Sequence, residues 1–240
     1  ASEIDDAISL GVGEPDFVTP WHIREACIHS LECGETSYTS NYGLLELREE
    51  ISGSFSGRYN VSYDPASEVL VTSGVSEALD VAIRAITNPG DEIIVPQPSY
   101  VAYVPSVMFA GGVPVPVMTS IENNFKLLPE DLEAVITDRT KALILNYPNN
   151  PTGATMGRKD LEAIADVVAE YDIMVISDEV YDCLTYNGGH TCFASLDGMR
   201  DRTILLNGFS KAYAMTGFRL AFAMAPKEII SAMMLIHQYC

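Results

Sequence analysis

Short apolar runs, each ending in a polar or glycine-containing turn, recur along the chain. They predict strands at residues 69–72, 93–95, 141–145, 173–176, 203–206 and 220–223. The runs are uniformly apolar rather than alternating, which is typical of parallel strands that have helices on both faces. Apolar residues recur at helical spacing within residues 75–86 and 161–168. This alternation predicts a three-layer α/β/α domain with a mostly parallel central sheet.

The charge and composition of the chain limit the classes of partner that it can bind. The 240 residues include 33 acidic and 14 basic side chains, a formal net charge of −19, and 48% of them are hydrophobic. The hydrophobic content argues against disorder. The charge repels nucleic acids and anionic membrane surfaces, so we expect neither as a partner. The longest apolar stretch, residues 104–118, is broken by glycines and prolines and is too short to cross a bilayer.

The five cysteines and four histidines have no metal-like spacing. An odd number of cysteines without a paired pattern favours free thiols in a reducing compartment over a disulfide framework or a zinc site. The first ten residues also lack the basic and apolar blocks of a signal peptide. We therefore expect a cytoplasmic location and no metal.

Ligands of such sheets bind beyond the carboxyl ends of the strands, and here those ends carry polar residues. After the first strand, residues 72–77 lead directly into a helix, and their backbone N–H groups and hydroxyls suit a phosphate. A serine N-cap is the commoner use of such a segment. After the second strand, Tyr100 follows two prolines and fits either the face of an aromatic ligand or the core. After the third strand, residues 146–153 predict a rigid loop, in which the role of Asn150 stays open.

The last two strand ends carry an acid and a lysine. Asp178 is either a helix cap or a buried carboxylate beside a ring nitrogen, which it would keep protonated. Lys211 lies among small and aromatic residues, whereas the other four lysines lie in a turn, at a strand start, on a polar helical face or at a helix start. A solvated loop lysine is the ordinary explanation. Burial would instead favour the neutral, nucleophilic amine that a Schiff base requires.

Taken together in this order, these segments resemble the class I/II aminotransferases, which are pyridoxal-phosphate enzymes of fold type I. The resemblance runs from Gly13 to Arg219, nearly the whole chain. Each motif alone is weak, but the set is highly specific. The strongest motifs are Asn150-Pro151-Thr152-Gly153, Asp178-x-x-Tyr181, and Ser210-Lys211 with Arg219 eight residues further on.

The resemblance implies pyridoxal 5'-phosphate as the cofactor and assigns residues around its ring. Lys211 forms the Schiff base and later moves the α-proton of the substrate. Asp178 pairs with the pyridinium nitrogen, and Tyr100 stacks on the ring. Tyr181 and Asn150 donate to the phenolic oxygen. Lys211, Asp178 and Tyr181 are thereby the expected catalytic residues.

The resemblance also assigns the phosphate and substrate ends of the site. A tyrosine of the neighbouring subunit in a homodimer reaches the phosphate, and the matching residue here is Tyr38. The substrate carboxylate lies beside Gly13 and Asn150. The residues that bind the phosphate are Gly74, Val75, Ser76 and Arg219, and Ser210 is a further cofactor-binding residue.

The implied reaction transfers an amino group between an L-amino acid of the aspartate or aromatic type and a 2-oxo acid. A carbon–sulfur lyase or a cyclopropane-carboxylate-type synthase shares these residues and stays an alternative. A non-catalytic, aminotransferase-like module of a transcription regulator is disfavoured, because the chain is acidic, has no DNA-binding segment and fills every catalytic position.

Two departures from the family pattern change the expectation. Many relatives carry a hydroxyl three residues before the lysine, where this chain has Gly208, so one phosphate contact is lost. The family's chain also continues into a small domain with an arginine for the substrate carboxylate, whereas this sequence stops at Cys240. We expect a segment at 1–18 that leads into the active site, a cofactor-binding large domain at 19–240, and no small domain. Alone, this piece should bind cofactor weakly and turn over poorly.

Overall fold

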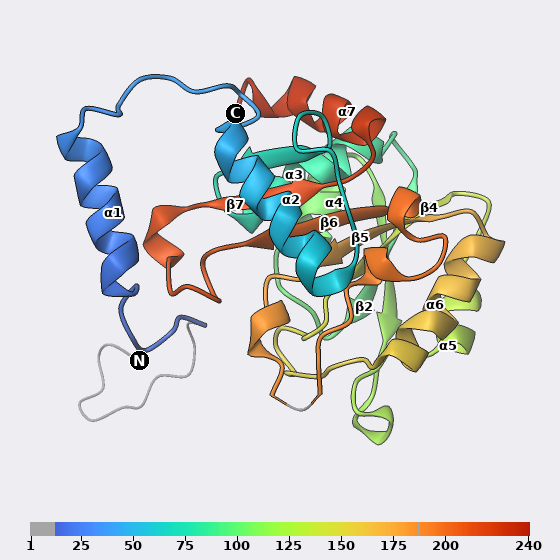
Figure 1. Cartoon of the computed structure of the whole chain (residues 1–240). Helices are drawn as coiled ribbons and strands as arrows, with labels where there is room; N and C mark the ends of the chain where they lie inside the picture. Colours follow the sequence, from blue (N-terminus) through green and yellow to red (C-terminus); the bar gives the residue numbers. More distant parts are fainter. Residues whose placement is uncertain (1–12, 187) are drawn as a thin grey trace, which may run out of the picture.

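The computed structural model describes residues 13–186 and 188–240, and its centre is a sheet of seven strands (Figure 1). Of the segment expected at residues 1–18, residues 1–12 lie outside the described part. The strands are β1 (Val69–Thr72), β2 (Glu92–Gln97), β3 (Val113–Met118), β4 (Thr140–Leu145), β5 (Met174–Asp178), β6 (Thr203–Gly208) and β7 (Ala221–Met224).

The strand order is β1-β7-β6-β5-β4-β2-β3. Strand β7 runs antiparallel to both of its neighbours, and all other pairs are parallel. The expected mostly parallel sheet is therefore confirmed. Strand β3 was not expected, because Pro114 and Pro116 interrupt its valines. It pairs only with β2 and lies at the sheet edge, where a missing N–H group leaves no ladder bond unmade.

Helices cover both faces of the sheet, which confirms the three layers. On one face lie α3 (Val75–Ile86), α4 (Tyr103–Phe109) and α7 (Lys227–His237). On the other lie α2 (Leu45–Tyr59), α5 (Pro129–Glu133) and α6 (Arg158–Glu170). Short 3-10 turns occupy Ile121–Asn123, Asp182–Leu184, Phe193–Ser195, Arg200–Arg202 and Thr216–Phe218.

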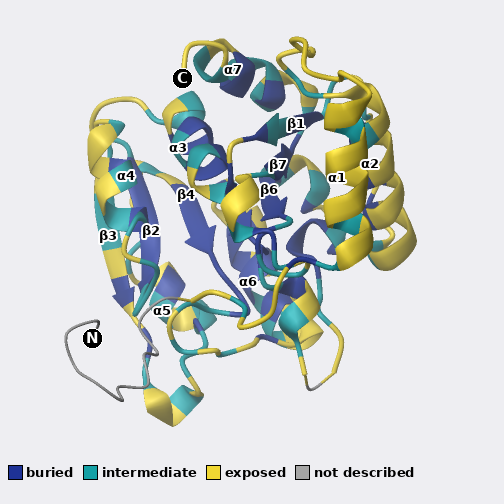
Figure 2. Cartoon of the chain, turned by 90° about the vertical axis from the view of Figure 1, so that its left-hand side faces the viewer, coloured by how far each residue is buried: buried dark blue, intermediate teal, exposed yellow. Residues whose placement is uncertain are grey.

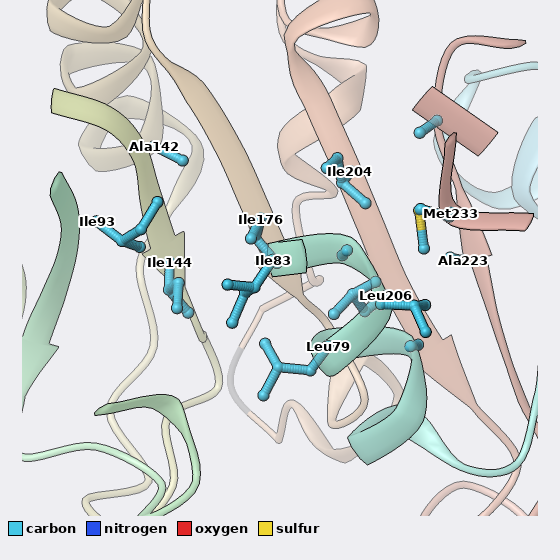
Figure 3. Packing of buried hydrophobic residues seen from close by; sticks show 14 of the residues in the cluster. Leu79, Ile83, Ile93, Ala142, Ile144, Ile176, Ile204, Leu206, Ala223 and Met233 are labelled. Atoms are coloured by element: carbon cyan, nitrogen blue, oxygen red, sulfur yellow. The ribbon is translucent and has the colours of Figure 1, made fainter. Parts of the chain in front are cut away.

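Alternate residues of the central strands enter the two cores. Ile204 and Leu206 of β6 face α3, whereas Leu205 between them faces α2. Figure 3 shows how Leu79 and Ile83 of α3 approach the sheet from one side. The apolar positions of α3 therefore fix the start of this helix over the ends of the strands. The sheet side chains of the same cluster that Figure 3 labels come from β2, β4, β5 and β6: Ile93, Ala142, Ile144, Ile176, Ile204 and Leu206.

Helix α1 (Trp21–Glu32) lies apart from these layers (Figure 1) and contains no buried residue. Figure 2 shows it as an almost wholly exposed helix beside the buried strands. Within residues 13–186 and 188–240, no helix has the length and apolar character that a membrane crossing requires.

Candidate active site

The sheet topology brings distant segments to one edge. Strands β1, β5 and β6 end there, and β7 begins there because it runs antiparallel between β1 and β6. The segments at these strand ends therefore lie next to one another. They carry Gly74, Asp178, Lys211 and Arg219, which are far apart in the sequence.

A cavity of about 370 Å³ opens at this edge. Its walls also include Glu14, Tyr103 and Thr216, which the sequence motifs did not single out. Tyr38 is not among the lining residues and is fully exposed outside the cavity. The expected site residues that line the cavity are Gly13, Val75, Ser76, Tyr100, Asn150, Asp178, Tyr181, Ser210, Lys211 and Arg219.

Lys211 is half-buried in the cavity wall, on the loop between β6 and β7. Its amine donates a hydrogen bond to the carbonyl oxygen of Gly13 and lies 6.0 Å from the centre of the Tyr181 ring. Burial lowers the pKa of Lys211, and the charge of Arg219 lowers it further, while Glu14 acts in the opposite direction. A lysine in this setting holds more of the neutral, nucleophilic amine than an exposed lysine does.

Asp178 ends β5 and is 5% exposed. Its Oδ2 accepts a hydrogen bond from the hydroxyl of Tyr103 at 2.7 Å, and its Oδ1 accepts one from the Val180 N–H at 3.2 Å. Burial raises the pKa of this carboxyl to about 6, although both hydrogen bonds lower it. No cationic side chain in the described part of the chain pairs with Asp178.

The start of α3 and the guanidinium of Arg219 form the far end of the cavity. Gly74 precedes the helix with a φ of 83°, and a Cβ at this position would overlap the Arg219 side chain. No side chain caps α3, so the serine N-cap interpretation of this segment is wrong. The first-turn N–H groups of α3 and the nearby cation are therefore a ready anion site.

Tyrosines and one asparagine form the remaining walls. The Asn150 amide donates to the Tyr181 hydroxyl at 3.5 Å. Burial and then the Asp178 charge raise the pKa of Tyr181, so its hydroxyl keeps its proton as a donor. Tyr100 lies edge-on to Tyr103, with their ring centres 5.6 Å apart.

Gly208 has a packing reason of its own. It ends β6 opposite Ala221 of β7, and a Cβ at position 208 would lie 2.7 Å from the Cβ of Ala221. A side chain here would force the two strands apart. A serine or threonine hydroxyl at position 208 is thus incompatible with this local packing.

Comparisons with known proteins identify the family and the fold. A sequence model of the family described as aminotransferase class I and II matches residues 5–239. The chain is 52% identical over 239 residues to a putative aminotransferase, YugH, of Bacillus subtilis, covering 100% of this chain and 62% of that protein. It is 45% identical to aromatic-amino-acid aminotransferase 2 of Thermococcus litoralis, with the same two coverages.

Solved structures extend the likeness to three dimensions. The crystal structure of an aromatic aminotransferase from Pyrococcus horikoshii superposes with a TM-score of 0.96 at 48% identity. The match covers 98% of this chain and 63% of that one. The chain thus spans a little over three-fifths of the length of these relatives.

Proposed function

This chain belongs to the class I and II aminotransferases, and on that premise we propose that the protein transfers an amino group between an L-amino acid and a 2-oxo acid. We propose pyridoxal 5'-phosphate as its cofactor. The observation that carries the proposal is the placement of Lys211 and the buried, cation-free Asp178 in one cavity. When bound, the cofactor supplies an aldehyde that condenses with amines and a ring that accepts electron density.

The residues present fit this cofactor. Asp178 is a buried carboxylate held by neutral donors, and a protonated ring nitrogen would supply the missing positive charge. Gly74 leaves room for Arg219 beside the free N–H groups of α3, which suits a phosphate. Tyr100 offers an aromatic wall between these two ends, against which the ring would lie.

Lys211 performs the proton transfers in this proposal. Its amine would hold the aldehyde of the cofactor when no substrate is bound. With substrate bound, Nζ would take the proton from the substrate α-carbon and deliver it to the cofactor carbon that had carried the aldehyde, not back to the α-carbon. The lowered pKa of Lys211 supports this role, because a base must be free of its proton when the substrate binds.

Tyr181 and Asn150 act as hydrogen-bond donors to the phenolic oxygen of the cofactor. Gly13 and Asn150 lie beside the carboxylate of the substrate. Val75, Ser76 and Ser210 complete the phosphate end. The exposed position of Tyr38 leaves it free to enter the site of a second subunit, so we propose a homodimer. In this arrangement residues 13–18 lead into the site and residues 19–240 form the cofactor-binding large domain.

For the substrate, we propose an amino acid of the aspartate or aromatic type. Relatives at 45% and 47% identity are named for aromatic amino acids and for aspartate, respectively. The five cysteines are free, and four of them are exposed, which fits a reducing cytoplasm.

Replacing the lysine tests the proposal. The full-length protein incubated with pyridoxal 5'-phosphate should show the visible absorption band of a lysine-bound cofactor, and Lys211→Ala should lose both the band and transamination. Lys159→Ala removes an exposed lysine of α6 and should change neither. Normal turnover in Lys211→Ala would contradict the proposal. Release of pyruvate and ammonia from a sulfur amino acid, without any 2-oxo acid acceptor, would favour a carbon–sulfur lyase instead.

A further inference from the structure

Tyr103 is a cavity residue to which the proposed function assigns no role. It is the first residue of α4 and is only 2% exposed. Its hydroxyl donates to Asp178 Oδ2 at 2.7 Å, a bond between residues 75 positions apart in the sequence. Its ring also lies edge-on against Tyr100, with an interplanar angle of 83°. Tyr103 therefore contacts two residues that face the proposed cofactor ring.

The hydrogen bond is of the strong kind. Buried tyrosine hydroxyls need a partner, and a backbone carbonyl or a water would satisfy them. Here the partner at 2.7 Å is a carboxylate, and hydrogen bonds to an ionised acceptor are roughly twice as strong as those between neutral groups. Among the described residues, the only other donor to this carboxylate is the N–H of Val180, at a longer 3.2 Å. Tyr103 is thus the nearest group that stabilises the charge of Asp178.

We propose that Tyr103 is a positioning residue that keeps the Asp178 carboxylate charged and fixed in one orientation toward the cavity. The inference rests on the proposed function, because the charge matters only if a ring nitrogen must be kept protonated. Two opposing influences act on Asp178. Burial and the charge of Glu179 favour the neutral acid, whereas the hydrogen bonds from the Tyr103 hydroxyl and the Val180 N–H favour the carboxylate.

The proton of this hydrogen bond stays on Tyr103. Burial and the neighbouring Asp178 charge both raise the pKa of Tyr103 well above its ordinary value, so the phenol is a neutral donor at every working pH. Without the hydroxyl, Asp178 would bind a proton more tightly. A proton shared between Asp178 and a ring nitrogen would then move toward the carboxylate, and the ring would lose its positive charge.

Tyr103→Phe tests the inference cleanly, because it removes the hydroxyl and keeps the ring that packs in the core and against Tyr100. The first measurement needs no cofactor: the carboxyl-carbon NMR signal of Asp178 is followed through a pH titration. We expect Tyr103→Phe to tighten proton binding by Asp178 about tenfold. Tyr63→Phe is the matched control, since Tyr63 is 3% exposed and its hydroxyl donates a hydrogen bond to the Arg200 carbonyl rather than to a carboxylate. It should leave the titration unmoved.

The second measurement uses protein loaded with pyridoxal 5'-phosphate that carries nitrogen-15 in its ring. The ring resonance of Tyr103→Phe should move toward that of neutral pyridine, and that of Tyr63→Phe should match the wild type. A purely structural Tyr103 predicts lower stability with no change in either signal, and that result overturns the inference. A full-length wild-type protein that never forms the visible band overturns the proposed function, whereas the cofactor-free titration still tests the role of Tyr103.

Discussion

Asp178 and its neighbours Glu179 and Asp182 are all buried carboxylates on one short segment, yet only the latter two have cationic partners. Oε2 of Glu179 lies 2.6 Å from His190 Nε2, and Oδ2 of Asp182 lies 2.8 Å from the Arg58 guanidinium. Asp178 faces the cavity and has neutral donors alone. The fold therefore places a cationic partner beside Glu179 and Asp182, and it leaves the buried charge of Asp178 uncompensated.

The two paired acids are satisfied in full. Glu179 also accepts hydrogen bonds from the Ser177 hydroxyl and the Phe193 N–H, both at 2.9 Å. Asp182 also accepts one from Tyr59 at 2.8 Å. Such pairing is the usual condition for burying a charge. The exception at Asp178 identifies where a positive charge from outside the chain would be stabilising.

The largest effect that we expect comes from Asp178→Asn, which removes the uncompensated charge. Transamination should fall roughly a thousandfold, because the ring nitrogen would lose the group that keeps it protonated. Steady-state rates of the loaded protein check this, with Asp197→Asn, a change at an exposed acid, as the control. Activity within a factor of two of wild type would contradict the proposed role of Asp178.

The same substitution should stabilise the cofactor-free protein. The pKa of Asp178 is raised from 3.8 to about 6, so the folded state binds this proton more tightly than the unfolded state. The free energy of unfolding therefore falls as pH rises from about 4 to about 6, by about 3 kcal/mol in total. Asp178→Asn should remove this pH dependence. Urea unfolding of the wild type and the variant at pH 4 and pH 7 measures the difference. If Asp178→Asn were less stable than wild type at pH 7, the buried charge of Asp178 would not be destabilising the cofactor-free protein.

The next largest effect breaks a paired acid. Arg58→Met leaves Asp182 buried without its cation and should lower the free energy of unfolding by about 2 kcal/mol, less than for a fully buried pair because Arg58 is partly exposed. Arg84→Met is the matched control, since the Arg84–Asp80 pair lies on the surface of α3 and is worth about 0.5 kcal/mol or less. Equal losses in the two variants would remove the distinction between buried and surface pairs.

The sequence did not predict which of these three acids has a cationic partner. The motif around Asp178 and Lys211 was predictable, because Asp178 ends one apolar strand, Lys211 lies in the loop after another, and parallel strands end at one edge. Which acid receives a cation depends on residues far along the chain: Arg58 lies 124 positions from Asp182. Tyr103 escaped notice for the same reason, since only the packing of α4 against the sheet brings it to Asp178.

Strand β3 was missed for a different reason. Its two prolines are unfavourable in a central strand, and nothing local reveals that this run lies at the sheet edge. Edge or centre is a property of the strand order, which depends on all seven strands together. The local pattern was therefore informative for strands buried on both faces and poor for the one that is not.

A smaller effect should follow from Tyr59→Phe, which removes one neutral donor from Asp182 and leaves the Arg58 ion pair. We expect a loss of about 1 kcal/mol in the free energy of unfolding. Both donors reach the same carboxylate oxygen, so the double variant with Arg58→Met should not show the sum of the two losses. Simple additivity, measured by urea unfolding of the four proteins, would show that the two donors act independently.

The smallest effect is a pH dependence at the other paired acid. Burial disfavours the His190 cation, but the hydrogen bond and charge of Glu179 outweigh it and raise the pKa of His190. Its contribution to stability is therefore complete below the unfolded pKa of about 6.5 and is lost as pH rises through the higher folded value. His190→Gln should remove this slope and keep the one that Asp178 causes below pH 6, whereas Asp178→Asn should do the reverse. Unfolding curves from pH 4 to pH 9 separate the two windows, and a slope above pH 6.5 that survives in His190→Gln would assign it to another group.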